Sequence, residues 1–235
     1  MNQPLVSICV PTCNLGQYSI PYLRQCLESL VAQDYPNIEV SISDHSIDDL
    51  VFNTVGEFDR LRITYARLSE HHGSAVVNLN SAITRSSGEL IKPLFQDDYL
   101  ASPSAISQMV GAILNSGRSW CGVGCRHVDE NDVDLNYYHP PGWIDTLEMA
   151  YGINLLGSPS VMMWRRDMDV MMDHNLKFLN DCELYYRYGK KHGPPALVMN
   201  TLVTIRMRKD GISAQSDIGE IKNKEHRYLD VKYPH

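Results

Sequence analysis

Two kinds of apolar pattern alternate along the chain. Short apolar, β-branched runs bounded by turn residues are typical of buried strands, whereas apolar residues spaced three and four positions apart are typical of amphipathic helices. The first pattern predicts strands over residues 5–10, 38–43, 61–66, 89–95, 120–128, 161–164 and 197–205. The second pattern predicts helices over residues 20–33, 74–86, 103–115 and 181–192. The alternation predicts an α/β fold with a mostly parallel central sheet flanked by helices.

The second half of the chain has less regular stretches. Residues 129–143 mix acidic residues with tyrosine, proline and glycine, which predicts a loop that could cover a site. An amphipathic segment follows at 144–151, and the sequence Ser-Pro-Ser at 158–160 predicts a turn. The polar, charged tail after Ser213 predicts either a helix or an extended arm.

Composition and charge narrow the functional classes. The 235 residues allow one large domain or two small ones, and the formal net charge of −7 argues against nucleic acid as a partner. No apolar stretch approaches the ~20 residues that span a bilayer, and the N-terminus does not resemble a signal peptide, so we expect a cytoplasmic protein without an integral membrane segment. The six cysteines include no CxxC pair, and Cys121 and Cys125 lack the second ligand pair of a zinc site.

Polar residues follow the first two predicted strands. Ligands of open parallel sheets bind beyond the carboxyl ends of the strands, which places Thr12, Asn14 and Asp44 where a ligand would bind. Asp44 could accept hydrogen bonds from a nucleobase or a ribose, or it could close an Asx turn, and the sequence leaves both interpretations open.

Two adjacent carboxylates follow the predicted strand over 89–95, in the sequence Gln96-Asp97-Asp98. With no basic residue next to them, these carboxylates repel each other unless a cation neutralises them, and oxygen ligands favour Mg²⁺ or Mn²⁺. Such an ion typically bridges protein to phosphate. The other interpretation of the pair is a turn or a helix cap.

A second acidic pair, Asp181 and Glu183, begins the last predicted helix. Residues two apart on a helix point about 200° away from each other, so at most one of them can face a given pocket and act as a general base. Both could instead cap the helix, because acidic groups in a first turn suit the helix dipole.

Two arginines and a histidine are further candidates for binding phosphate groups. Arg206 and Arg208 lie at the end of the predicted strand over 197–205, where they could bind a diphosphate or form a solvated charged surface. His72 precedes Gly73 in a predicted loop, where an imidazole could bind phosphate or metal or could be solvated.

Taken in order, these segments resemble the inverting glycosyltransferases of family 2, which have the GT-A fold in a single continuous domain. Residues 6–14, VSICVPTCN, resemble the opening strand and turn of the family, and residues 26–40, CLESLVAQDYPNIEV, resemble its first helix and second strand. The resemblance implies a GT-A domain over 1–213, with a nucleotide-sugar-binding half over 1–100, an acceptor and catalytic half over 101–213 and a C-terminal tail over 214–235.

The resemblance also implies roles for individual residues. Asp97 matches the last acid of the metal-binding motif, with Asp98 beside it, whereas Phe95 stands where the family has its first acid. Asp181 matches the catalytic base, and Arg208 replaces a histidine that sometimes ligates the metal. Contacts with the nucleotide sugar are implied for Pro11, Thr12, Asn14, Asp44, His72, Gly73, Asn80, Gln96, Asp97, Arg206 and Arg208.

The implied function is a metal-dependent, inverting sugar transfer that uses Mn²⁺ or Mg²⁺. The donor would be a nucleoside diphosphate sugar, UDP-linked by family habit, and the acceptor a hydroxyl of a glycan, lipid or protein. One alternative is a carbohydrate- or nucleotide-binding protein of the same fold with impaired catalysis, for which Phe95 and Arg208 are the evidence. Another is a nucleotidyltransferase, although residues 12–17 lack the basic residue that this class usually has after its first strand.

Overall fold

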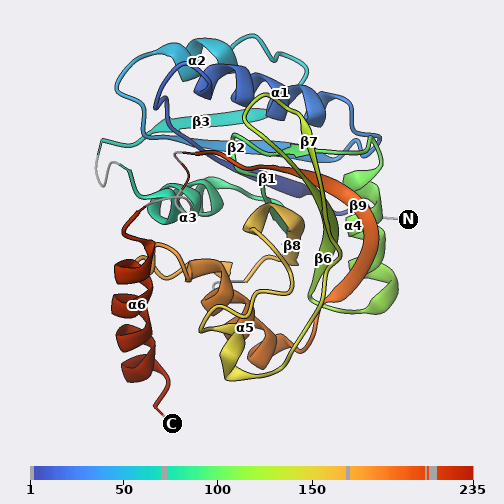
Figure 1. The fold of residues 1–235 in the computed structure, drawn as a ribbon. Coiled ribbons are helices and arrows are strands. Elements are labelled where there is room, and N and C mark those ends of the chain that lie inside the picture. The colour runs from blue at the N-terminus through green and yellow to red at the C-terminus, as the bar shows by residue number, and fades with distance from the viewer. Residues whose placement is uncertain (1–2, 70–72, 168–169, 210, 212–215, 235) are drawn as a thin grey trace.

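One mixed β-sheet forms the centre of the computed structural model, which describes residues 3–69, 73–167, 170–209, 211 and 216–234 (Figure 1). In this part of the chain the sheet has nine strands in the order β3-β2-β1-β4-β8-β6-β9-β5, with β7 paired to β6. The strands are β1 Val6–Thr12, β2 Ile38–Asp44, β3 Ile63–Arg67, β4 Leu90–Pro93, β5 Tyr99–Leu100, β6 Trp120–Val128, β7 Asp134–His139, β8 Met162–Arg165 and β9 Ala196–Arg206. The helices are α1 Ser19–Val31, α2 Leu50–Val55, α3 Ala75–Arg85, α4 Ala105–Ser116, α5 Asn180–His192 and α6 Ile218–Lys232, with short 3₁₀ turns η1 Leu147–Met149 and η2 Pro159–Val161.

The N-terminal half of the sheet is parallel and the C-terminal half is mixed. Strands β3, β2, β1 and β4 run parallel to one another, while β8 runs antiparallel to both β4 and β6. Beyond β8, β6 and β9 pair parallel and β9 pairs antiparallel with β5. The predicted α/β class with a central sheet flanked by helices is therefore confirmed, and only the N-terminal half of the sheet is entirely parallel. Apolar runs report that a strand is buried and not which way it points, so the reversal at β8 has no signal in the sequence.

Helices cover both faces of the parallel strands. In Figure 1, α1 and α2 lie on one side of β1 to β3, and α3 lies on the other. Each helix buries the apolar stripe that its spacing predicts, as α1 does with Leu23, Leu27 and Leu30. Burying a leucine fully contributes about 1.5–3 kcal/mol, so these stripes fix the helices on the sheet and leave the carboxyl ends of β1, β2 and β4 at one edge.

A buried carboxylate joins β1, β2 and the turn before β4. Glu39 accepts hydrogen bonds from the Ser7 hydroxyl at 2.6 Å, the Gly88 N–H at 3.0 Å and Arg62 at 2.6 Å. Burial by itself raises the pKa of Glu39, but hydrogen bonds from Ser7, Ser87 and Arg62 outweigh it and lower the pKa to about 2. A Cβ on Gly88 would lie 2.5 Å from the Ser7 hydroxyl oxygen, so the turn requires glycine there.

Several segments differ from their predictions. The prediction of a loop over 129–143 is wrong for Asp134–His139, which forms β7 antiparallel to β6. Val133, Leu135 and Tyr137 alternate with polar residues, but all three are exposed, so β7 pairs with β6 through its backbone and buries no apolar face. The short α2 and the two-residue β5 were not predicted, and the segment over 144–151 contains only the turn η1.

The C-terminal tail is helical. Of the two predicted possibilities, a helix or an arm, the structure has the helix α6, which is drawn in red in Figure 1. In the described part of the chain, no helix is both long enough and apolar enough to cross a bilayer.

Candidate active site

A cavity of about 500 Å³ opens at the carboxyl ends of β1 and β4. Segments that are far apart in the sequence form its wall, including the end of β1, the start of α3, the turn after β4, the start of α5 and the end of β9. Nine of the predicted site residues line it: Pro11, Thr12, Gly73, Gln96, Asp97, Asp98, Asp181, Arg206 and Arg208. Asn14, Asp44 and Asn80 are not among the lining residues, and His72 lies outside the described residues.

Backbone and amide contacts fix the rim of the cavity at β1. The Thr12 carbonyl accepts hydrogen bonds from the His45 N–H at 2.9 Å and the Asn78 side-chain amide at 2.8 Å. Gln96 exchanges two hydrogen bonds of 2.9 Å with the backbone N–H and carbonyl of Cys13. The Gln96 contacts join the turn after β4 to the loop after β1 at the rim of the cavity.

Asp44 is buried and is bound by its own neighbours. One carboxylate oxygen accepts hydrogen bonds from the Ser46 N–H at 2.8 Å and the Ser46 hydroxyl at 2.6 Å, and the other accepts from Tyr65 at 2.7 Å. The hydrogen bond from the Ser46 N–H closes an Asx turn, which is one of the two interpretations that the sequence allowed for Asp44. The Ser46 hydroxyl in turn accepts from the Asn14 N–H at 2.7 Å, so Asp44 and Asn14 together order the loops behind the cavity.

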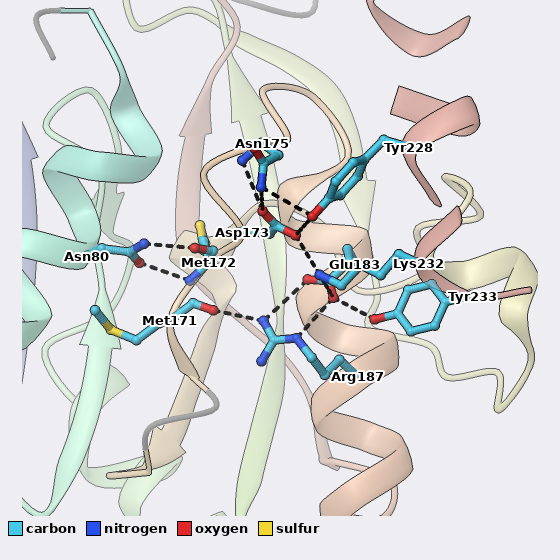
Figure 2. A network of polar contacts seen from close by, with 10 residues as sticks. All are labelled: Asn80, Met171, Met172, Asp173, Asn175, Glu183, Arg187, Tyr228, Lys232 and Tyr233. Atoms are coloured by element: carbon cyan, nitrogen blue, oxygen red, sulfur yellow. Dashed lines mark hydrogen bonds and ion pairs between the residues drawn. The ribbon is translucent and has the colours of Figure 1, made fainter. Parts of the chain in front are cut away.

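Asn80 binds a segment that is 92 positions away in the sequence. Its side-chain amide donates to the Met172 carbonyl at 2.8 Å and accepts from the Met172 N–H at 2.9 Å (Figure 2). This pair of hydrogen bonds attaches α3 to the segment that precedes α5. Asn80 thus contributes to the position of the segment before Asp181.

The two carboxylates after β4 lie in an environment that disfavours two negative charges. Burial, and then the neighbouring charge of Asp97, raise the pKa of Asp98 to about 7, and burial also raises the pKa of Asp97. Asp98 accepts a hydrogen bond from the Arg206 N–H at 3.1 Å. A divalent cation beside Asp97 would offset the repulsion, and Mg²⁺ or Mn²⁺ typically takes its remaining ligands from water and phosphate. The pair fits such an ion on these grounds, although the described residues contain no cluster of three or more metal-binding side chains.

The two arginines at the end of β9 have different surroundings. Only 1% of the Arg206 side chain is exposed, its guanidinium lies 4.2 Å over the Tyr22 ring, and it donates to the side chains of Gln25 and Asp132. Arg208 lies beside the acidic pair, with its guanidinium 3.4 Å from the Asp97 carboxylate. Arg206 therefore braces the loop between β6 and β7 against α1, and Arg208 supplies positive charge next to Asp97.

Asp181 also lines the cavity, from the first turn of α5. Its carboxylate accepts hydrogen bonds from the Asn154 side chain at 2.9 Å and the Cys182 N–H at 2.8 Å, and burial raises its pKa to about 6. Asn154 was not predicted, because a polar residue in an irregular segment carries no signal of the long-range contact it will make. A carboxylate with a pKa near neutrality can accept a proton and release it again.

Glu183 points away from the cavity. It is fully buried and binds Arg187 at 2.9 Å, Lys232 at 2.9 Å and Tyr233 at 2.6 Å (Figure 2). As the spacing predicts, the two acidic residues of this helix face different surroundings, and only Asp181 reaches the cavity.

A sequence model described as Glycosyl transferase family 2 matches residues 7–170, more than half of the chain. The chain belongs to glycosyltransferase family 2. Its relatives include WcaA of Escherichia coli (strain K12), named as a colanic acid biosynthesis glycosyl transferase, which is 26% identical over 204 residues. That match covers 83% of this chain and 69% of WcaA. A glycosyltransferase of Rickettsia felis is 29% identical over 144 residues, which cover 58% of this chain and 22% of the relative.

Solved structures share the GT-A fold of this family 2 chain. S. aureus TarS 1–349 in complex with UDP-GlcNAc superposes with a TM-score of 0.74 at 18% identity, covering 96% of this chain and 66% of that one. The mannosyltransferase PcManGT from Pyrobaculum calidifontis, in complex with GDP-Man and Mn²⁺, has a TM-score of 0.68 at 17% identity and covers 100% of this chain and 66% of that one. The chain therefore spans just under two thirds of these solved chains and a smaller part of some relatives.

Proposed function

We propose that this family 2 glycosyltransferase transfers a sugar, with inversion, from a nucleoside diphosphate sugar to a hydroxyl acceptor in a metal-dependent reaction. One observation carries the proposal: the acidic pair after β4 and the half-buried carboxylate of Asp181 line the same cavity. The acidic pair suits a cation that binds a diphosphate, and Asp181 suits a general base. A displacement with inversion needs these two groups at the two ends of one site.

At the donor end, Asp97 and Asp98 are the residues that would hold Mn²⁺ or Mg²⁺. When bound, the ion supplies positive charge that stabilises the departing diphosphate. Arg208 lies next to Asp97 and would bind the diphosphate from the side of β9. The complexes of TarS with UDP-GlcNAc and of PcManGT with Mn²⁺ support a UDP-linked donor and a divalent metal by analogy of fold.

At the acceptor end, Asp181 would accept the proton of the attacking hydroxyl. Asn154 and the Cys182 N–H orient its carboxylate, and burial makes it more basic than an exposed aspartate. The hydroxyl oxygen forms its bond to the anomeric carbon while the bond to the diphosphate breaks on the opposite face, so the configuration inverts. The acceptor would be a glycan, lipid or protein hydroxyl.

A second candidate function is nucleotide-sugar binding without transfer. The observation that favours it is the ion pair between Arg208 and Asp97, because a guanidinium at 3.4 Å stands beside the carboxylate that a metal would use. Phe95 also lines the cavity in place of an acid. Binding of UDP with no turnover of any nucleotide sugar would favour this candidate.

The proposal is tested with a panel of nucleotide sugars and hydroxyl acceptors, with Mn²⁺ and with EDTA. We expect release of nucleoside diphosphate from one UDP-linked donor in Mn²⁺ and a loss of at least about 100-fold in EDTA, because the metal stabilises the charge on the leaving group. Product anomers are assigned by NMR. Retained anomeric configuration, or equal turnover in EDTA, would contradict the proposed reaction.

The reaction should slow on acidification with a midpoint near pH 6. Burial raises the pKa of Asp181 to about 6, so the carboxyl is half protonated there and cannot accept a proton in that form. We expect kcat at saturating donor to rise between about pH 5 and about pH 7 and then to level off. The affinity for UDP with Mn²⁺ is measured over the same pH range. If it stays constant while kcat falls, the fall in kcat does not come from protonation at the donor end. A flat kcat profile would argue against Asp181 as the base.

A further inference from the structure

The C-terminal helix α6 packs against the segment that leads into α5. Leu229 of α6 is fully buried and clusters with Leu176 and Leu179, which precede Asp181. The apolar contact places one face of α6 against the wall of the cavity, since Lys177 and Phe178 of this segment are lining residues. Lys222 of α6 lies 4.5 Å over the Phe178 ring on the same side.

Glu225 of α6 binds the backbone immediately before the helix that carries Asp181. Its carboxylate accepts hydrogen bonds from three consecutive backbone N–H groups, those of Lys177 at 2.6 Å, Phe178 at 3.0 Å and Leu179 at 2.8 Å. Leu179, at the N-cap position of α5, offers no side-chain acceptor of its own. Glu225 is only 6% exposed, so without it these three backbone N–H groups would lose a buried acceptor, and its carboxylate fixes the course of the backbone into α5.

The same helix also binds the residue two positions after Asp181. Lys232 and Tyr233 donate to Glu183 at 2.9 and 2.6 Å, and Lys232 also donates to Asp173, at 2.5 Å (Figure 2). Helix α6 therefore fixes the chain on both sides of Asp181. The contacts come from positions 225, 229, 232 and 233, which lie on one face of α6.

We propose that α6 is a positioning element for the catalytic base, and that Glu225 is its positioning residue. The proposal rests on the proposed role of Asp181. Glu225 does not line the cavity and acts through the backbone of residues 177–179. A displacement of about 1 Å at a reacting group can lower the rate by about 100-fold. Loss of the Glu225 contacts to residues 177–179 would therefore slow transfer. It would leave the donor end unaffected, because α6 does not touch that end through these contacts.

The test is Glu225→Gln in the full chain, with Glu220→Gln as a matched control. Glu220 is exposed on the same helix and Gln keeps the shape of the side chain in both variants. At Glu225, the new amide group places N–H donors against the N–H groups of residues 177–179. We expect kcat, measured with the donor found in the panel, to fall by about 10- to 100-fold, while the dissociation constant of UDP with Mn²⁺ stays within about twofold. Glu225→Asp, which keeps the carboxylate, should recover part of the loss.

Two further measurements distinguish positioning from general stability. In an Asp181→Asn background, Glu225→Gln should cause no further loss of residual transfer, because it acts through the base that is already absent. If Glu225→Gln does not fold, the Tyr233→Phe variant is used in its place, because this substitution removes only the hydrogen bond from Tyr233 to Glu183. For this variant we expect a kcat loss of a few fold, again with unchanged UDP affinity.

The outcomes separate this proposal from the proposed function. Unchanged kcat in Glu225→Gln, equal loss of kcat and UDP affinity, or additive losses with Asp181→Asn would each overturn the positioning role. Full activity of Asp181→Asn alone would instead overturn the assignment of the base itself.

Discussion

Asp181→Asn is expected to lower kcat by about 10³- to 10⁴-fold, which is the upper range for removal of a general base. The amide keeps the size of the side chain and one acceptor oxygen for the Asn154 contact, but it cannot accept a proton at neutral pH. The donor end of the cavity is formed by the turn after β4 and the end of β9, so binding of UDP with Mn²⁺ should change by less than about twofold.

This expectation is checked by steady-state kinetics and by calorimetric titration with UDP and Mn²⁺. Asp145→Asn is a suitable control, because Asp145 is an exposed aspartate that is not among the lining residues. Parallel losses of transfer, UDP binding and thermal stability would show that Asp181 holds the structure of the site and does not act as the base.

Asp97→Asn is expected to weaken the binding of UDP in the presence of Mn²⁺ by about 30- to 100-fold and to remove transfer. The amide lacks the negative charge that a divalent cation requires, and the loss corresponds to about 2–3 kcal/mol of metal-mediated attraction between the protein and the diphosphate. In EDTA, wild type and variant should bind UDP with equal, weak affinity. Titrations with UDP under both conditions, with Asp49→Asn as an exposed control, measure this difference.

A different result would assign the neutralising charge to Arg208. If wild type binds UDP equally well in Mn²⁺ and in EDTA, and Asp97→Asn changes neither value, then no cation is needed at this position. Arg208→Ala would then be the variant that loses UDP affinity, because its guanidinium is the positive group beside Asp97.

The first β-α-β unit shows how much of the fold local sequence could predict. Strands predicted over 5–10 and 38–43 and a helix predicted over 20–33 correspond to β1 Val6–Thr12, β2 Ile38–Asp44 and α1 Ser19–Val31. In α1 the buried positions follow the spacing of the apolar residues, whereas β1 and β2 are buried along almost their whole length, polar residues included, so their short apolar, β-branched composition carried the prediction. Strand β7 was missed because its short alternation at Val133, Leu135 and Tyr137 lies among turn-forming residues and its pairing with β6 buries none of these side chains.

In the candidate site, too, only the residues with a local sequence signal were predicted. Asp97, Asp98 and Asp181 were predicted because a carboxylate next to a strand end or in a first helical turn is visible in the sequence. Asn154 and Glu225 were not, because each acts on residues 27 to 48 positions away and nothing in its own neighbourhood indicates the contact. Asp44 lies where it was expected, at a strand end, but its carboxylate turns to Ser46 and Tyr65.

The sequence by itself therefore determined the α/β class, the strand ends that carry the acidic residues and the resemblance to family 2, because these properties depend on local periodicity and short motifs. Only the tertiary structure decided that β8 runs antiparallel and that Arg206 is buried while Arg208 lies beside Asp97. It also decided that the C-terminal helix binds the segment before Asp181. Each of these depends on free energies of packing and hydrogen bonding between segments that are far apart along the chain, which no local pattern records.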